Sequence, residues 1–153
     1  PYHRGNMPVI LPPEFHPNWD GWPEQMSPLD WDIWKPYREK HRSEFIRFFH
    51  NVHVGQGTQP PEGTPPELAL MWMKSTMMRI DVVGERENEI WIIEVRHNAG
   101  PSAISGVQIY KTIWDSEEPI PKPSRAVIIS DMITPQYRAA MELFHILPII
   151  IEV

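Results

Sequence analysis

The distribution of proline constrains this chain more than any other feature of its sequence. Eighteen of the 153 residues are proline, and twelve of these lie within residues 1–66. Because proline fixes φ and lacks a backbone N–H, a proline-rich segment forms neither a helix nor a central strand. Seven prolines fall within residues 1–28. We therefore predict that residues 1–26 form an extended N-terminal arm.

Large aromatic side chains accompany these prolines. Exposed rings favour association with other surfaces, and an extended segment stays ordered only where something holds it. Two explanations remain open: the arm packs on its own domain, or it packs on another protein chain. The second predicts partner-binding aromatic residues in and just after the arm, namely Phe15, Trp19, Trp22, Trp31 and Trp34.

Residues 27–54 have the pattern of a kinked helix. Ser27 is a suitable N-cap, with Pro28 at the first helical position. Pro36 is expected to kink or divide the helix. The second part carries an apolar stripe at helical spacing, formed by Phe45, Phe48, Phe49 and Val52. This segment is also the most basic in the chain. We interpret its basic residues as a solvated helix face rather than a DNA-binding face: Lys35, Arg38, Lys40, Arg42 and Arg47.

A loop rich in proline and glycine, residues 55–66, precedes a second predicted helix. Thr64 and Glu67 have the spacing of a capping box, with Pro65 at the first position of the helix. The segment from Leu68 to Met73 is apolar on nearly all sides. A helix of this kind is expected to be well buried.

Residues 67–153 read as an α/β core in which a mixed central sheet is flanked by helices. After the first helix, strands are predicted at 77–84, 89–96, 125–130 and 147–153, and helices at 102–114 and 135–144. The short turn between the first two strands predicts an antiparallel hairpin. The later strand–helix–strand unit predicts a parallel pair with a right-handed crossover. Pro148 predicts that the last strand lies at an edge or begins one residue later.

Composition excludes several classes of protein. The chain has no cysteine, so it is neither a disulfide scaffold nor a thiolate zinc protein. No apolar run approaches about 18 residues, which excludes a membrane span. No leader pattern opens the sequence, so we expect no signal peptide and a cytoplasmic or virion-like location. The formal charge of −6 argues against broad non-specific binding of nucleic acid.

Three charged residues of the predicted hairpin form a candidate site. Glu94 and Arg96 are two residues apart on one strand and share a face, because successive side chains alternate. The hairpin brings Asp81 of the first strand opposite that face. Two carboxylates that converge at strand ends suit Mg²⁺, which prefers oxygen ligands and keeps several waters. A nearby cation would stabilise charge that develops on a phosphate.

The segment RIDVVG, followed thirteen residues after Asp81 by Glu94 in IIEVR, resembles the core motif of the PD-(D/E)xK nuclease superfamily. The resemblance covers residues 64–153 and implies a restriction-endonuclease-like or Holliday-junction-resolvase-like fold. It also implies that Asp81 and Glu94 bind the metal and position the attacking water, with Gln108 in support. The family's lysine is Arg96 here, and arginine is not equivalent at a catalytic site. Lys111 is the nearby lysine that could replace it.

Three functions remain open. The sequence favours a nuclease-fold subunit with weakened or absent chemistry, serving a larger assembly such as a viral or mobile-element particle through contacts of its arm with other chains. The alternative is an active Mg²⁺-dependent DNA endonuclease or resolvase; only this one needs a cofactor. A module that binds DNA without cleavage, through the basic segment at residues 35–47, is the third.

Overall fold

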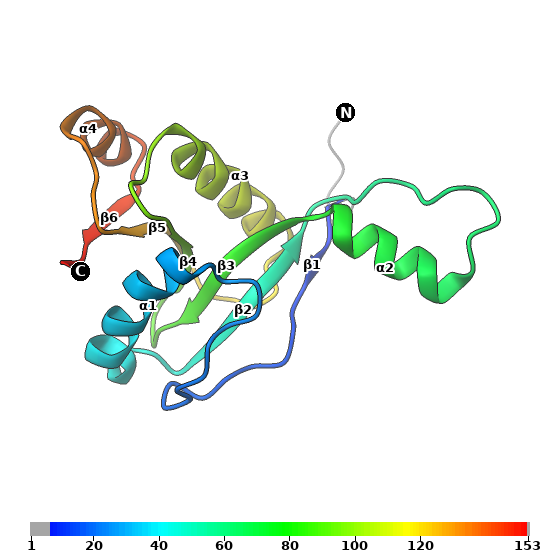
Figure 1. The fold of residues 1–153 in the computed structure, drawn as a ribbon, viewed down its shortest axis with the longest axis horizontal. Coiled ribbons are helices and arrows are strands. Elements are labelled where there is room, and N and C mark those ends of the chain that lie inside the picture. The colour runs from blue at the N-terminus through cyan, green and yellow to red at the C-terminus, as the bar shows by residue number, and fades with distance from the viewer. Residues whose placement is uncertain (1–6, 153) are drawn as a thin grey trace.

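The computed structural model describes residues 7–152 and forms one six-stranded sheet with four α-helices (Figure 1). The strands lie in the order β1-β2-β3-β4-β5-β6. Neighbours from β1 to β4 are antiparallel, whereas β4, β5 and β6 are parallel. The elements are β1 (Val9–Ile10), α1 (Pro28–His41), β2 (Arg47–Val54), α2 (Pro66–Thr76), β3 (Met78–Glu85), β4 (Ile90–Val95), α3 (Pro101–Glu117), β5 (Ser124–Ser130), α4 (Pro135–Leu143) and β6 (Leu147–Ile150).

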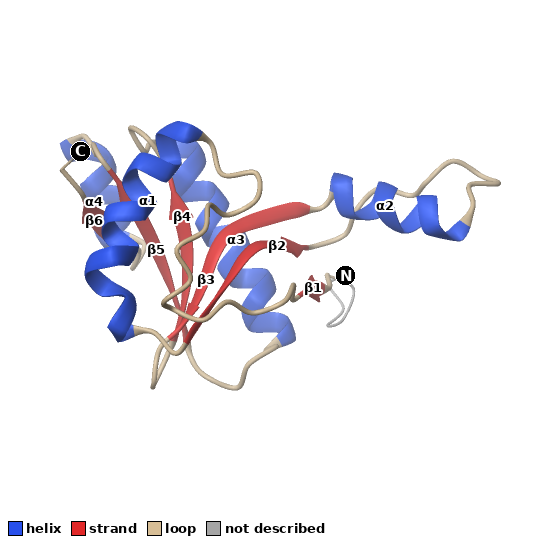
Figure 2. Ribbon diagram, turned by 60° about the horizontal axis from the view of Figure 1, so that its bottom comes forward, coloured by secondary structure: helices blue, strands red, loops and turns tan. Residues whose placement is uncertain are grey.

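The sheet is the middle layer of three (Figure 2). Residues of α3 and α4, including Trp114 and Met141, pack on one face. Residues of α1, including Trp34, pack on the other face. Strand β4 is buried throughout, since Ile92 faces the α3 side and Ile93 faces the α1 side. Burial on both faces explains the continuous apolar run of this strand.

The predicted α/β class and mixed sheet are confirmed, as are the hairpin and the parallel strands. Strands β3 and β4 pair antiparallel, and β5 pairs parallel with both β4 and β6. Strand β6 lies at the edge of the sheet, as Pro148 predicts. Val153 of the predicted last strand lies outside the described residues. No helix among the described residues is long and apolar enough to span a membrane.

The predicted helix over residues 27–54 is wrong in its second half. Helix α1 ends at His41, and Arg47–Val54 form strand β2 between β1 and β3. Pro36 lies inside α1 without ending it. Five of the eight residues of β2 are buried, including three in a row from Phe48 to His50. Its apolar side chains therefore do not alternate strictly, and their spacing resembles that of a helix.

The expectation that residues 67–76 form a buried helix is also wrong, because no residue of α2 is buried. The helix projects away from the sheet (Figure 1). The capping box does not form. Pro65 occupies the N-cap position, and the Thr64 hydroxyl instead donates to the carbonyl of Pro61 at 2.5 Å.

The segment before α1 runs along β2 of the same chain. Val9 pairs with Val54, and the N–H of Phe15 donates to the carbonyl of Phe48 at 2.8 Å. The N–H of Phe48 donates in return to the carbonyl of Phe15 at 3.0 Å. Of the two open explanations, the described part therefore shows packing on its own domain. Residues 1–6 of the predicted arm lie outside the described residues.

Candidate active site

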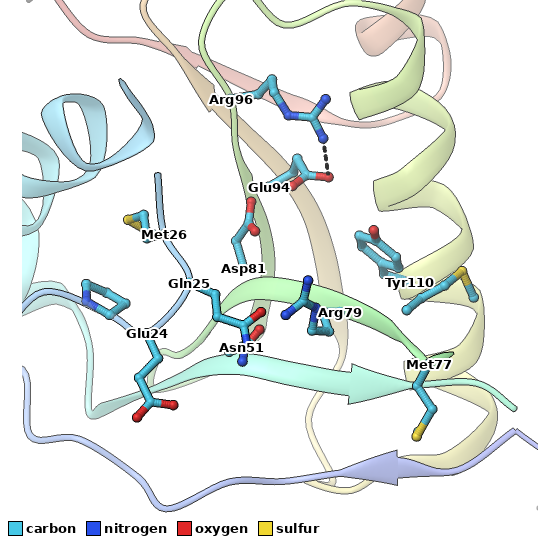
Figure 3. A pocket seen from close by; sticks show the side chains of 12 residues that line it. Glu24, Gln25, Met26, Asn51, Met77, Arg79, Asp81, Glu94, Arg96 and Tyr110 are labelled. Carbon is cyan, nitrogen blue, oxygen red and sulfur yellow. Dashed lines mark ion pairs between the residues drawn. The ribbon is translucent and has the colours of Figure 1, made fainter. Parts of the chain in front are cut away.

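The candidate site lies where β3 separates from β4. Strand β3 pairs with β2 on both sides of Asp81, but not at Asp81 itself, and it pairs with β4 only from Val82 to Glu85. Continuing that register by one residue places Asp81 opposite Glu94 at the point of separation. Asp81 Oδ2 accepts the N–H of Val95 at 2.9 Å, so a side chain replaces the missing strand partner. A cavity of about 290 Å³ opens here (Figure 3).

Asp81 and Glu94 form a buried acid pair. Their carboxyl groups are hydrogen-bonded to one another, and Glu94 is only 3% exposed. Burial is the main reason that the pKa of each carboxyl is raised. The bond between them raises the pKa of Glu94 further and opposes the rise at Asp81. The pair therefore holds a proton more readily than two exposed carboxyls would.

Arg96 borders the acid pair. Its Nη2 lies 3.4 Å from Glu94 Oε2 (Figure 3), and its Nη1 donates to Ser102 Oγ in the first turn of α3 at 3.0 Å. The side chain is 39% exposed, so it bridges the buried acids and solvent. Its positive charge lowers the pKa of both carboxyls without overcoming the effect of burial.

Helix α3 contributes a residue that the sequence did not single out. Tyr110 lines the cavity (Figure 3), and its pKa is raised to about 12 by burial and by the charges of Glu94 and Asp81. One turn earlier, a Cβ on Gly106 would lie 3.3 Å from Glu94 Oε2 and 3.6 Å from the Tyr110 hydroxyl. Glycine at this position leaves room for the acid. In the sequence, Tyr110 shares helical spacing with Val107 and Trp114, which is typical of a core residue and gives no signal of a site.

The remaining walls come from other elements. Arg79 lies on β3 and Asn51 on β2, while Gln25 and Met26 belong to the segment before α1 (Figure 3). Asn51 and Gln25 have positive φ values of 56° and 64°. Nothing in the sequence pattern indicated these residues, because their approach depends on the path of the chain.

Gln108 and Lys111 lie away from the acid pair. Gln108 lines a shallow groove with Ile109 and Thr112 on another side of α3. Lys111 Nζ lies 2.6 Å from Asp115 Oδ2 within the same helix. The structure therefore brings together three of the five predicted catalytic residues, Asp81, Glu94 and Arg96.

Asp30 connects the site to the start of α1. Its Oδ1 accepts the N–H of His97 at 3.2 Å, and its negative charge raises the pKa of both buried acids. His97 Nδ1 in turn lies 2.6 Å from Asp131 Oδ2, beyond β5. These contacts fix the chain where it leaves β4, directly after Arg96.

The predicted partner-binding aromatic residues differ in exposure. Trp34 is a residue of α1 and is fully buried between this helix and the sheet, so its ring contacts only its own chain. Phe15 and Trp19 lie with ring centroids 4.3 Å apart, and both are partly buried. Trp22 is 49% exposed and stacks on Trp31 at 5.0 Å. Trp22 is therefore the most accessible of the five.

Two carboxylates suit a magnesium ion that keeps several waters. Among residues 7–152, no group of three or more His, Asp or Glu side chains is placed to hold a metal ion. The acid pair nevertheless fits the chemistry, because a proton now offsets one of two buried charges and a divalent cation would offset both.

Comparisons with protein-family models, curated proteins and solved structures found no match to the chain.

Proposed function

We propose that the chain is a Mg²⁺-dependent nuclease with a restriction-endonuclease-like fold, and that Asp81 and Glu94 form its metal site. One observation carries the proposal: two carboxyls on neighbouring strands meet, largely buried, at a polar cavity where the sheet divides. Burying an acid pair costs stability that an apolar pair would not. Perturbed acids in a cavity are typical of functional sites. The motif resemblance to PD-(D/E)xK nucleases points to the same chemistry.

Each residue has a role that follows from its surroundings. The N–H of Val95 orients the Asp81 carboxylate, and Glu94 would hold the metal as a carboxylate after losing its proton to solvent. A bound Mg²⁺ would supply positive charge to the phosphate and favour ionisation of the attacking water. Arg96 stays protonated, so it stabilises negative charge on the phosphate and does not act as a base. Tyr110 lines the cavity as a neutral phenol, so its hydroxyl is able to donate a hydrogen bond to a bound phosphate.

A cleavage assay tests this function. Duplex, single-stranded, flapped and branched DNA are incubated with Mg²⁺ or Mn²⁺ and the chain of 153 residues. We expect Asp81→Asn and Glu94→Gln to reduce the rate at least about 100-fold, the usual scale for a key electrostatic group. Lys111→Ala is the matched control, because Lys111 pairs with Asp115 away from the site. Cleavage that survives Asp81→Asn contradicts the proposal.

A second function is favoured by the ion pair between Arg96 and Glu94. In that case the arginine neutralises the acid pair permanently, and the chain is a non-catalytic component of a larger assembly, such as a virion-like particle. Exposed Trp22 is then the residue to contact other chains. A folded chain that neither cleaves DNA nor gains thermal stability from Mg²⁺ or Mn²⁺ supports this alternative. Metal-dependent stabilisation that Asp81→Asn removes argues against it.

A further inference from the structure

Helix α2 exposes the apolar side chains that its sequence led us to expect in a core. No residue of the helix is buried. Leu70 is 53% exposed and Met71 is 66% exposed, and Leu68, Trp72 and Met73 are also exposed. The helix stands away from the sheet in both ribbon views (Figures 1 and 2). An apolar patch that residues 7–152 leave uncovered marks an interaction site.

Residues 55–77, the excursion that links β2 to β3, contain both α2 and a loop. One face of α2 already packs against this loop. Trp72 Nε1 donates to Thr58 Oγ1 at 3.0 Å, and the N–H of Thr58 donates to Thr76 Oγ1 at 2.8 Å. A Cβ on Gly57 would lie 2.3 Å from the carbonyl oxygen of Met73, so the loop lies directly against the helix. These contacts hold the excursion in shape and leave the opposite face free.

The free face carries Glu67, Leu70, Met71 and Lys74. Their spacing of i, i+3, i+4 and i+7 places them on one side of the helix. Two apolar residues occupy the centre, with an acid at the N-terminal end and a base at the C-terminal end. Two copies of this face are therefore complementary when the helices run antiparallel. Glu67 of each copy then lies beside Lys74 of the other, and Leu70 of each lies beside Met71 of the other.

We propose that α2 docks against α2 of a second copy of this chain, in an antiparallel pair related by a two-fold axis between Leu70 and Met71. Apolar burial drives the contact, and the two Glu67–Lys74 pairs set its direction. A parallel pair would place like charges side by side, which is unfavourable. This contact is independent of the proposed nuclease function, since α2 contributes no residue to the cavity of the acid pair.

The pair is expected to be weak and reversible. Helices of eleven residues are about 16 Å long, so their contact is smaller than a standard stable interface of ~1,600 Å². We expect a dissociation constant in the micromolar range, measured by sedimentation at several protein concentrations. A chain that stays monomeric up to about 1 mM overturns the proposal.

Exchanging charges tests the direction of the pair. Glu67→Lys alone places Lys beside Lys74 of the other copy, and Lys74→Glu alone places two acids together. Each change is expected to weaken dimerisation about fivefold, since two exposed ion pairs become repulsive. The double exchange restores the pairs and returns the dissociation constant to within about twofold of the wild type. Loss of affinity in the double exchange equal to the sum of the single losses overturns the antiparallel pair.

Cross-linking provides a second readout, because the chain has no cysteine of its own. Under mild oxidation, Glu67→Cys with Lys74→Cys is expected to give a disulfide-linked dimer, while Glu67→Cys alone does not. Leu70→Glu with Met71→Glu is expected to abolish dimerisation. Leu143→Glu on α4 is the control, since Leu143 is 75% exposed elsewhere on the surface. Rapid cross-linking of Glu67→Cys alone shows a parallel pair and overturns the proposal.

Discussion

The buried carboxyl of Glu94 makes the stability of the fold depend on pH. Its raised pKa means that the folded chain holds a proton above about pH 4.5, where an unfolded glutamate has released it. The folded state therefore binds more protons, and its stability falls as pH rises from that value. Glutamine has the same shape and carries no titrating proton. We predict that Glu94→Gln, which the proposed function requires to be inactive, is more stable than the wild type by about 1–3 kcal/mol at pH 8.

Urea denaturation at pH 4, 6 and 8 measures this effect, with the advantage of Glu94→Gln growing toward pH 8. Glu62→Gln in the exposed loop is the control and is expected to leave stability unchanged. Equal stability of Glu94→Gln and wild type at pH 8 would show that the buried pair costs nothing.

At the residue scale, strand geometry predicted more of the site than helix geometry did. Asp81, Glu94 and Arg96 could be placed together because side chains alternate in strands and a hairpin fixes which strands face each other. Gln108 and Lys111 could not be placed, because each residue turns a helix by about 100° and the docking of α3 decides which side faces the acids. The structure gives that side to Tyr110 and Gly106.

At the element scale, the segment before α1 covers a polar group that lacks a partner. His50 on β2 lies beneath Phe15 and Trp19, with ring centroids 4.9 and 5.5 Å away. Neither of its ring nitrogens has a hydrogen-bond partner in the described chain. Burial, together with the charge of Arg38 on α1, lowers the pKa of His50 to about 4.

The sign of the resulting pH dependence is opposite to that of Glu94. Between pH 6.5 and about 4, His50 binds a proton in the unfolded chain but not in the folded chain. The stability of the fold therefore falls as pH falls through this range. We predict that His50→Leu removes this part of the acid destabilisation. It should also stabilise the fold at neutral pH by about 1–3 kcal/mol, the cost of buried unpaired polar atoms. Thermal melts across this pH range measure it, with the same change at exposed His16 as the control.

The same scale explains why two elements were mispredicted. The side chains of β2 are buried on both faces, and buried strands and helices of this length cannot be distinguished by apolar spacing alone. The apolar composition of α2 was interpreted as burial within the chain. The composition indicates only that the helix needs a cover, and in the proposed dimer the second copy supplies it.

At the scale of the whole molecule, residues 56–76 are separate from the body, whereas Gly55 and Met77 at the base of the excursion are buried. Val54 and Met78 face each other in the β2–β3 ladder, so the excursion leaves and returns at one point of the sheet. Because α2 has no buried residue, the core does not depend on it. We predict that replacing residues 56–76 with Asn-Gly gives a folded chain, since four-residue hairpin connections are common.

The shortened chain should keep its near-ultraviolet circular dichroism and lose the concentration-dependent dimer. Its acid pair should remain intact, because Asp81 and Glu94 are held by β3, β4 and the N–H of Val95. Metal-dependent cleavage by a monomeric shortened chain would place chemistry and association in different parts of the molecule. Loss of cooperative unfolding would instead show that the excursion supports the core, contrary to the prediction drawn from the lack of buried residues in α2.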